Sequence, residues 1–472
     1  MWGQSAENRG SRPVVHAAGG DRGPFPCPPV EPPSVGRDDA VMKTHHPPLS
    51  ILLALLASTL TGSVVTRADE PVAITLPESD EGLPGVGPIR RYDWFRNLWK
   101  ERRGAWAART AADKRALVFL GDSITQGFGD DFQGAFPGAK LANRGISGDT
   151  TRGMLLRLAD DVLALDPAGV VMLMGTNDLE EGATPEAIAA NIKAIIAAIE
   201  AKNPRTPIVV CQMFPSATEK KRPAEAIKQV NSLVAAAVKN DPRVRLVDTW
   251  TLFAGPHGDA KAEEFPDLLH PNDAGYAKWI AAIRPVLETL DLVPVAADDF
   301  QPEAGFEMLF NGRDLTGWGY REQKSQARHL DLDGRQSSPD GRYVAKHGRI
   351  VVTTPPEGRR VEQLWTTREF PGNFELRLQF RATPTADSGV FIRAPQLQCR
   401  DYLLAGPYKE LQHYRPQDWN DLVVTVTNGT AHCTCNGEVL EAALAVPASG
   451  PIGLEGDSGQ LEYRRLRINK LP

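Results

Sequence analysis

Hydrophobic and polar positions divide the chain into parts with different patterns. Between residues 113 and 292, short apolar runs alternate with longer stretches in which apolar residues recur every three or four positions. The short runs lie at residues 117–120, 169–174, 208–211 and 244–247. Such runs are typical of strands buried on both faces, and their alternation with helices predicts a parallel sheet with helices on both sides. We therefore expect a three-layer α/β domain over residues 113–292.

Amphipathic helices are predicted beside this sheet. The clearest begins at Thr184-Pro185, because threonine is a good N-cap and proline suits the first helical position. Its apolar face is formed by Ile188, Ile192, Ile195 and Ile199. A second is predicted over residues 92–109, where apolar side chains lie among basic ones. We expect a structural role, in packing on the α/β domain, for its side chains Trp94, Phe95, Leu98, Trp99 and Trp106.

The part after residue 304 has the shorter pattern of an antiparallel β protein. Partly alternating runs lie at residues 347–353, 374–381, 389–393, 422–427, 431–436 and 461–468. Asn428-Gly429 and Asn436-Gly437 separate some of them, and Asn-Gly is a strong signal for a hairpin turn. We therefore expect an antiparallel β-sandwich over residues 305–472, joined to the α/β domain by a linker over residues 293–304.

The beginning of the chain differs from both domains. Residues 1–41 contain seven prolines and six glycines without periodicity, which predicts disorder. Residues 42–68 have the order of a secretory signal: Met42-Lys43, a short apolar run, and a small-residue site ending at Ala68. We therefore interpret residues 1–41 as a gene-model extension and expect a secreted or periplasmic protein with no membrane span beyond the signal segment. An uncleaved membrane anchor is the alternative. Residues 69–112 are interpreted as a connector and an N-terminal helix.

Composition and charge exclude some classes of function. The 472 residues are 42% apolar and 24% charged, with a formal net charge of −6, as in ordinary globular proteins. No basic stripe with interleaved aromatic residues occurs, so no nucleic-acid partner is expected. Cys433 and Cys435 lack the further ligands of a zinc site. We expect the cysteines to be packed in the core or to form one disulfide that involves Cys399.

Four blocks of polar and glycine residues in the α/β part contain the types of catalytic residue that a serine ester hydrolase needs. They are Gly121-Asp122-Ser123, Ser147-Gly148-Asp149-Thr150, Gly175-Thr176-Asn177-Asp178 and Asp267-Leu268-Leu269-His270. The first and third follow predicted strands directly. Because ligands of open α/β sheets bind at the carboxyl ends of strands, we expect these blocks to meet in one active site.

Residues of these blocks fit separate steps of acyl transfer. Ser123 is the candidate nucleophile, and His270 is the candidate base that takes its proton. Asp267 precedes the histidine by three residues and is the candidate carboxylate that orients the imidazole. An oxyanion hole is predicted from the N–H groups of Ser123 and Gly148 and the side-chain amide of Asn177. Other polar residues have structural predictions: loop bracing for Asp122, Asp149 and Asp178, exposure for His257, and packing for Cys211.

The blocks resemble those of the SGNH/GDSL hydrolase family over roughly residues 115–292. Within that family, Gly148-Asp149-Thr150-Thr151-Arg152 and Gly275-Tyr276-Ala277-Lys278 look closest to the branch of platelet-activating-factor acetylhydrolase-like and sugar acetylesterases. The resemblance implies a flavodoxin-like three-layer fold and the roles given above for the serine, glycine, asparagine and histidine. It also implies hydrolysis of small acyl esters, often acetyl, without a metal or other cofactor.

Residues 305–472 resemble the 3-keto-disaccharide hydrolase domain, a concanavalin-like β-sandwich that contacts sugars. The resemblance is carried by residues 306–318, 388–393, Trp419-Asn420 and Asn436-Gly437-Glu438. Gln396 and Gln398 stand where that family has Glu-x-Gln, and an amide cannot titrate, so glycoside cleavage is less favoured than binding or scaffolding. These two glutamines, with Trp318 and Trp419, are the candidate substrate-binding residues. Core packing is the alternative for both tryptophans.

Taken together, the sequence predicts a secreted serine esterase that removes small acyl groups, with acetyl as the first candidate, from carbohydrate. The expected partners are an acylated carbohydrate or a small ester, with glycan binding by the C-terminal domain. One alternative is a lipid or lysophospholipid-type esterase, which would need an apolar acyl cleft. The other is a glycoside-acting protein in which the β-sandwich carries the main activity.

Overall fold

The computed structural model describes residues 74–322, 328–353 and 362–472. These residues belong to one unit of the chain, Asp69–Pro472. The predictions of a disordered segment over residues 1–41 and a signal over residues 42–68 lie outside the described residues. Within the described ranges, every helix is too short or too polar to cross a bilayer.

The α/β domain is built on a parallel sheet with the strand order β2-β1-β3-β4-β5. Its strands are β1 (Leu117–Gly121), β2 (Leu141–Gly145), β3 (Gly169–Leu173), β4 (Ile208–Cys211) and β5 (Val244–Val247). This is the flavodoxin-like order, in which the chain changes direction across the sheet between β1 and β3. The predicted fold is confirmed, and β2 is the strand that the sequence pattern did not predict.

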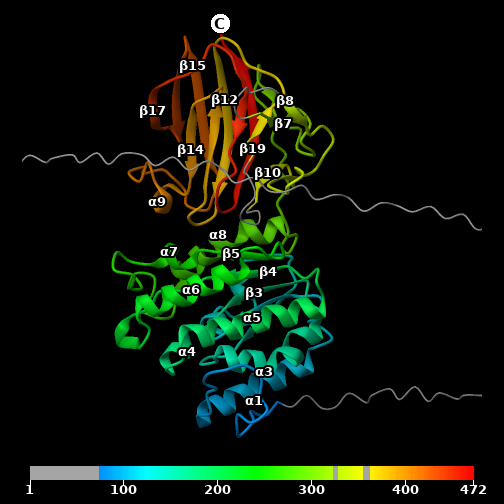
Figure 1. The fold of residues 1–472 in the computed structure, drawn as a ribbon, viewed down its shortest axis with the longest axis vertical. Helices are drawn as coiled ribbons and strands as arrows, with labels where there is room; N and C mark the ends of the chain where they lie inside the picture. The colour runs from blue at the N-terminus through cyan, green and yellow to red at the C-terminus, as the bar shows by residue number, and fades with distance from the viewer. Residues whose placement is uncertain (1–73, 323–327, 354–361) are drawn as a thin grey trace, which may run out of the picture. The chain divides into compact units, whose positions relative to one another are not determined.

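Helices cover both faces of this sheet (Figure 1). One face is packed by α3 (Thr151–Asp161), α5 (Pro185–Lys202) and α6 (Ala224–Val238), and the opposite face by α8 (Asp273–Thr289). The α5 helix begins as predicted, because the Thr184 hydroxyl accepts a hydrogen bond from the N–H of Ala187 at 3.3 Å. Shorter elements are α2 (Ser123–Gly127), α4 (Thr176–Glu180), α7 (Thr249–Phe253) and the 3₁₀ turns η1 (Phe132–Gly134), η2 (Leu163–Leu165) and η3 (Thr218–Lys220).

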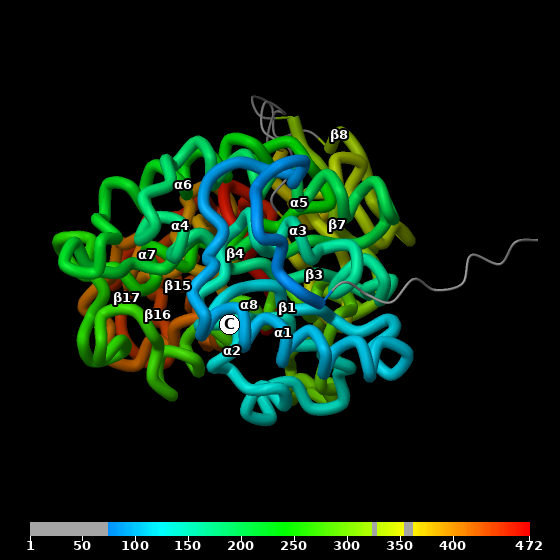
Figure 2. Tube along the Cα trace, turned by 90° about the horizontal axis from the view of Figure 1, so that it is seen from below, coloured from blue at the N-terminus to red at the C-terminus, as the bar shows by residue number. Residues whose placement is uncertain are grey.

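The helix predicted before the sheet is α1 (Asp93–Ala108), which contacts α3. Phe95, Trp99 and Trp106 are buried in one cluster with Ile146, at the end of β2. Figure 2 shows the blue segment that leads into α1 lying across the α/β domain. The predicted structural role is confirmed for Trp99 and Trp106. Trp94 differs, because 51% of its surface is exposed.

The C-terminal domain consists of two antiparallel sheets, which confirms the predicted β-sandwich. One sheet has the order β17-β16-β15-β12-β19-β10-β9 with β6 paired to β19, and the other has the order β14-β13-β18-β11-β7-β8. The strands begin with β6 (Glu307–Met308), β7 (Trp318–Arg321), β8 (Arg328–Asp331), β9 (Tyr343–Lys346), β10 (Arg349–Val352), β11 (Leu364–Thr366) and β12 (Phe374–Ala382). They continue with β13 (Asp387–Ile392), β14 (Gln396–Arg400), β15 (Asn420–Thr427), β16 (Thr430–Cys435), β17 (Glu438–Ala445), β18 (Ile452–Leu454) and β19 (Leu461–Lys470), and the short helix α9 (Tyr402–Ala405) precedes β15.

The described cysteines are buried free thiols, namely Cys211, Cys399, Cys433 and Cys435. The disulfide alternative is therefore wrong for Cys399, Cys433 and Cys435, and core packing is confirmed. All three lie in the core of the sandwich. Their burial in an apolar environment raises the pKa of each thiol, to about 12 for Cys433 and Cys435.

Candidate active site

Ser123 is the first residue of α2, directly after β1. The chain turns sharply there, and a β-carbon at Gly121 would lie 2.1 Å from Oγ1 of Thr125 and 2.5 Å from the carbonyl oxygen of Leu173. Only glycine fits so close an approach of strand, turn and neighbouring strand. Asp122 caps the turn, since its Oδ1 accepts a hydrogen bond from the N–H of Ile124 at 3.0 Å. Ser123 is held at the carboxyl end of β1 and is half-buried.

The structure brings Ser123, His270 and Asp267 together. Nε2 of His270 lies 2.9 Å from Oγ of Ser123, and Nδ1 lies 2.7 Å from Oδ2 of Asp267. Oδ1 of Asp267 also accepts hydrogen bonds from the backbone N–H groups of Leu269 and His270, at 3.0 and 2.7 Å. A carboxylate tied to the loop in this way fixes the orientation of the imidazole, with Nδ1 as the donor and Nε2 free to accept a proton.

Asp267 is held ionised by these contacts. Partial burial raises the pKa of its carboxyl, but the hydrogen bonds from the backbone and ring of His270 and from Leu269 outweigh it and lower the pKa to about 2. The carboxylate is therefore charged at every pH at which an ester hydrolase works. It can stabilise an imidazolium on His270 through their hydrogen bond.

Gly148 and Asn177 lie after β2 and β3, the strands on either side of β1, at the same end of the sheet as Ser123. Gly148 follows β2 with φ of +85°, a left-handed conformation that favours glycine. Asn177 lies in α4 directly after β3, and its Nδ2 donates a hydrogen bond to the carbonyl oxygen of Asp149 at 3.0 Å. This bond joins the asparagine to the loop that carries Gly148.

The amide of Asn177 is oriented by Arg222. Nη2 of this arginine donates to Oδ1 of Asn177 at 3.2 Å, and its Nε donates to the carbonyl oxygen and the hydroxyl of Thr176. A guanidinium only donates, so the Asn177 oxygen must face it and the NH₂ group must face the loop. One amide hydrogen is used on Asp149, and the other can donate to a substrate oxygen.

The aspartates of the blocks brace the loops, as predicted. Asp149 forms an ion pair with Nε of Arg157 at 2.8 Å, with both side chains fully buried. Nη2 of Arg157 also donates to the carbonyl oxygens of Gly121 and Arg144, so one guanidinium ties the serine loop to the glycine loop. Asp178 accepts hydrogen bonds from the N–H and hydroxyl of Thr151.

Burial raises the pKa of Asp178 to about 7. A raised pKa means that the folded protein binds a proton that the unfolded chain, with a carboxyl pKa near 4, releases. The stability from this protonated form is present below about pH 4 and is lost as the pH rises through about 7. An asparagine side chain cannot ionise, so the variant Asp178→Asn does not lose that stability. We therefore expect the thermal midpoint of Asp178→Asn minus that of the unsubstituted protein to increase as the pH rises from 5 to 8. Thermal unfolding of both proteins across that range tests this, and a difference in midpoint that does not change with pH would contradict it.

Arg157 and Arg222 were missed by the sequence analysis. Arg157 stands seven residues after Thr150 in α3 and would have looked like a solvent-facing helix residue. Arg222 follows Lys220-Lys221, and such a basic run is normally exposed. Both guanidinium groups are buried, at 0% and 2% side-chain exposure. Neither arginine could be identified as buried from the sequence, because the backbone oxygens that accept their hydrogen bonds come from other segments of the chain.

Other polar candidates in the α/β domain lie away from this site. His257 is exposed in a turn, and Cys211 is buried and accepts a hydrogen bond from Nε1 of Trp279 at 3.4 Å. Among the described residues, no group of three or more histidine, cysteine, aspartate and glutamate side chains is placed to hold a metal ion.

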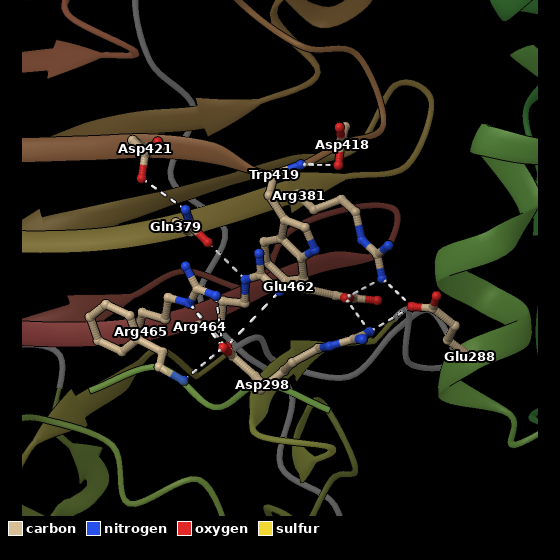
Figure 3. Close-up of polar contacts among 12 residues, drawn as sticks. Glu288, Asp298, Gln379, Arg381, Asp418, Trp419, Asp421, Glu462, Arg464 and Arg465 are labelled. Atoms are coloured by element: carbon tan, nitrogen blue, oxygen red, sulfur yellow. Dashed lines mark hydrogen bonds and ion pairs between the residues drawn. The ribbon is translucent and has the colours of Figure 1, made fainter. Parts of the chain in front are cut away.

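The tryptophans that are candidate substrate-binding residues, Trp318 and Trp419, pack against other groups of the sandwich, and Trp419 is only partly buried. Trp318 is fully buried, and its Nε1 donates to the carbonyl oxygen of Leu309 at 2.8 Å. The ring of Trp419 lies under the guanidinium groups of Arg464 and Arg381, whose Cζ atoms are 4.0 and 4.8 Å from the ring centroid (Figure 3). Arg381 in turn pairs with the carboxylates of Glu462 and Glu288, each at 2.7 Å. The structure therefore gives both tryptophans packing partners and does not support sugar stacking by Trp318.

The glutamines of β14 lie beside a carboxylate that the sequence analysis missed. Gln396 donates a hydrogen bond to Oε2 of Glu455, which directly follows β18. Strand β13 runs between β14 and β18, and Gly389 on it leaves room, since a β-carbon there would lie 2.3 Å from Nε2 of Gln396. Gln398 accepts a hydrogen bond from Arg400 at 2.6 Å. Although residue 396 is an amide, this face of the sheet still has a titratable carboxyl group, that of Glu455.

Comparison with known protein families gives a match for each domain. Residues 119–278 match the GDSL-like lipase/acylhydrolase family. Residues 305–469 match the 3-keto-alpha-glucoside-1,2-lyase-like domain. The first match includes Ser123, Gly148, Asn177, Asp267 and His270, and the second includes nearly all of the β-sandwich.

This chain is similar to subunits of platelet-activating factor acetylhydrolase. Platelet-activating factor acetylhydrolase IB subunit alpha2 from Bos taurus is 31% identical over 165 residues, covering 34% of this chain and 71% of the relative. The alpha1 subunit from Homo sapiens is 29% identical over 192 residues, covering 40% of this chain and 82% of the relative. A solved GDSL-like lipase from Bacteroides thetaiotaomicron is 26% identical with a TM-score of 0.37, covering 40% of this chain and 97% of that chain.

Proposed function

Because the chain belongs to the GDSL-like lipase/acylhydrolase family, we propose that it is a serine esterase that removes small acyl groups, acetyl first, from carbohydrate outside the cytoplasm. The observation that carries the proposal is the continuous hydrogen-bonded row from Ser123 through His270 to Asp267. Such a row is the arrangement that activates a serine hydroxyl for attack on an ester.

In the proposed reaction, Oγ of Ser123 attacks the ester carbonyl carbon while Nε2 of His270 takes the hydroxyl proton across 2.9 Å. The carbonyl oxygen becomes an oxyanion, which accepts hydrogen bonds from the N–H groups of Ser123 and Gly148 and from Nδ2 of Asn177. Asp267 stabilises the imidazolium that forms on His270.

The tetrahedral intermediate then collapses. The bond from the carbonyl carbon to the leaving oxygen breaks, and that oxygen takes the proton from Nε2 of His270, which releases the alcohol and leaves an acyl-serine. Water repeats the sequence in the second half, with His270 first as base and then as acid. The products are the free carboxylic acid and the restored Ser123 hydroxyl.

Carbohydrate is proposed as the alcohol part of the ester because of the second domain. Residues 305–469 are similar to a domain family named for a glucoside-cleaving activity, and a domain of that class brings the esterase to sugar-containing material. Export is proposed from the signal-like segment over residues 42–68. N-terminal sequencing of the exported protein tests this part, and a mature chain that still carries Met42 would contradict it.

Acetate release tests the substrate. The full chain is incubated with acetylated xylan, acetylated chito-oligosaccharides, p-nitrophenyl acetate and p-nitrophenyl dodecanoate, with Ser123→Ala in parallel. We expect Ser123-dependent acetate release from at least one glycan and little activity on the long-chain ester. Activity confined to the long-chain ester would contradict the carbohydrate assignment and favour a lipid-type esterase.

A second candidate activity, cleavage of a glycosidic bond, is favoured by Glu455. Burial raises the pKa of its carboxyl, with the hydrogen bond from Gln396 acting in the opposite direction, and a raised pKa suits a group that donates a proton to a leaving oxygen. If the sandwich has this activity, sugar release from a 3-keto-glucoside by the full chain is lost in Glu455→Gln and unchanged in Ser123→Ala. Equal release by Glu455→Gln and the unsubstituted protein would exclude this role.

A further inference from the structure

An exposed tryptophan lies directly against the glycine of the proposed oxyanion hole. A β-carbon at Gly148 would lie 2.5 Å from Cη2 of Trp94 and 2.9 Å from Nη1 of Arg90. Trp94 is the second residue of α1, whose other tryptophans are buried, yet 51% of its surface is exposed. The indole therefore borders the place where the ester carbonyl binds, and it keeps a large area open to solvent.

Tyr92 extends this surface. Its ring is nearly parallel to that of Trp94, with an interplanar angle of 14° and 6.3 Å between the ring centroids, and 52% of the residue is exposed. Its hydroxyl lies 3.5 Å from Oε2 of Glu181. Exposed apolar side chains that form a contiguous patch often mark a binding site. We call these two rings the Tyr92–Trp94 platform.

A polar cavity of about 240 Å³ adjoins the platform. Its lining residues are Arg90, Tyr92, Trp94, Glu180, Glu181 and Lys221. A cavity lined by aromatic rings and several hydrogen-bonding groups suits a ligand that has both C–H faces and hydroxyl groups.

A row of charged side chains connects the cavity to the oxyanion hole. Arg90 pairs with Glu180 and, at 2.7 Å, with Glu181. Glu180 also pairs with Arg222 at 2.8 Å, and that arginine orients Asn177. The cavity wall and the oxyanion donor Asn177 are therefore connected by one set of ion pairs.

We propose that the Tyr92–Trp94 platform and its cavity form the sugar subsite of the esterase, with a pyranose ring of the substrate stacked on the Trp94 indole. The sugar hydroxyls bind the carboxylates of Glu180 and Glu181, and the acylated oxygen projects toward Gly148. This inference rests on the proposed esterase function and specifies its substrate class as an acylated glycan rather than a lipid.

The charge of the cavity separates this proposal from other ligands. Four of the lining side chains are charged, two of each sign, so apart from the two aromatic rings the walls offer little apolar surface for a long acyl chain. A quaternary ammonium group would be attracted by the aromatic rings and the carboxylates, but these carboxylates already pair with Arg90 and Arg222, and the cations Arg90 and Lys221 would repel it. A neutral ligand with many hydroxyl groups can use both the carboxylates and the cations as hydrogen-bond partners.

The test compares Trp94→Ala, Trp94→Phe and the control Val439→Ala, which removes an exposed apolar side chain from the sandwich. Steady-state kinetics are measured on acetylated xylo-oligosaccharides, on p-nitrophenyl acetate and on acetylcholine. We expect Trp94→Ala to lower kcat/KM on the sugar substrate by about tenfold, mainly through KM, because the stacked contact is lost. Trp94→Phe should recover part of this loss, and the loss on p-nitrophenyl acetate should be several-fold smaller than the loss on the sugar substrate.

Several outcomes would overturn the proposal. An equal loss on p-nitrophenyl acetate would show that Trp94 only supports Gly148, and a loss confined to acetylcholine would assign the platform to a quaternary ammonium group. Unchanged sugar kinetics in Trp94→Ala would show that the sugar binds elsewhere while the esterase function stands. If the unsubstituted protein hydrolyses p-nitrophenyl acetate through Ser123 but no acetylated sugar, both the carbohydrate assignment and this subsite fail.

Discussion

Replacing Ser123 with alanine is expected to lower kcat/KM for every ester substrate by a factor of about 10⁴ to 10⁶. The reason is that the substitution removes the oxygen that attacks the carbonyl and leaves Nε2 of His270 without its partner at 2.9 Å. The fold should be preserved, since Ser123 is half-buried and alanine is smaller. Initial rates on p-nitrophenyl acetate and on an acetylated glycan measure the effect.

Ser338→Ala is a suitable control for this variant. It removes another poorly exposed hydroxyl, one that donates to Asp340 in the sandwich, and it should lower stability without lowering esterase turnover. If Ser123→Ala kept activity within tenfold of the unsubstituted protein, Ser123 would not be the nucleophile. The reaction would then have to proceed through another group.

Asn177→Ala is expected to lower kcat by about 10² to 10³ with little change in KM. The amide hydrogen that it removes strengthens its contact as charge develops on the carbonyl oxygen, so its loss weakens the transition state more than the bound substrate. The hydrogen bond to Asp149 at 3.0 Å and the bond from Arg222 at 3.2 Å are also lost. Separate determination of kcat and KM on p-nitrophenyl acetate tests this expectation.

A matched control for Asn177→Ala is Asn420→Ala in the sandwich. Asn420 is fully buried, and its amide donates to the carbonyl oxygens of Arg415 and Asp418. Its truncation should lower the thermal midpoint and leave kcat of the esterase unchanged. A rise in KM with constant kcat in Asn177→Ala would instead assign Asn177 to substrate binding and contradict its place in the oxyanion hole.

Much of the fold was predictable because its strands have regular patterns. The runs that form β1, β3 and β4 are continuously apolar, as buried parallel strands require. The run that forms β5 contains Arg245, and Leu246 is exposed, because β5 lies at the edge of the sheet. β2 was missed because it contains Asn143 and Arg144, which are buried through local partners. Asn143 donates to the carbonyl oxygen of Thr125, and Arg144 pairs with Asp113 at 2.7 Å. Such partners come from other segments, so a local sequence pattern cannot predict them.

The candidate site was predictable where its residues stand in short blocks. Asp267 and His270 are close in sequence, and Ser123 and Asn177 each follow a predicted strand, so the meeting of these two at one end of the sheet could be derived. The strand before Gly148 was missed, so the glycine could be assigned only from its block. The surroundings of the site could not be derived. Trp94 lies before the sheet begins, and nothing in its helix distinguishes it from Trp99 and Trp106, which are buried. Likewise, Glu455 meets Gln396 only because Gly389 leaves a gap on the strand between them.

Covalent labelling tests the central claim most directly. The full chain is treated with a fluorophosphonate, which reacts with activated serine hydroxyls, and the modified peptide is located by mass spectrometry. The structure predicts one adduct, on Ser123, which is slowed strongly in His270→Ala because the base at 2.9 Å is lost. An adduct on a different serine, or labelling at an unchanged rate in His270→Ala, would contradict the account.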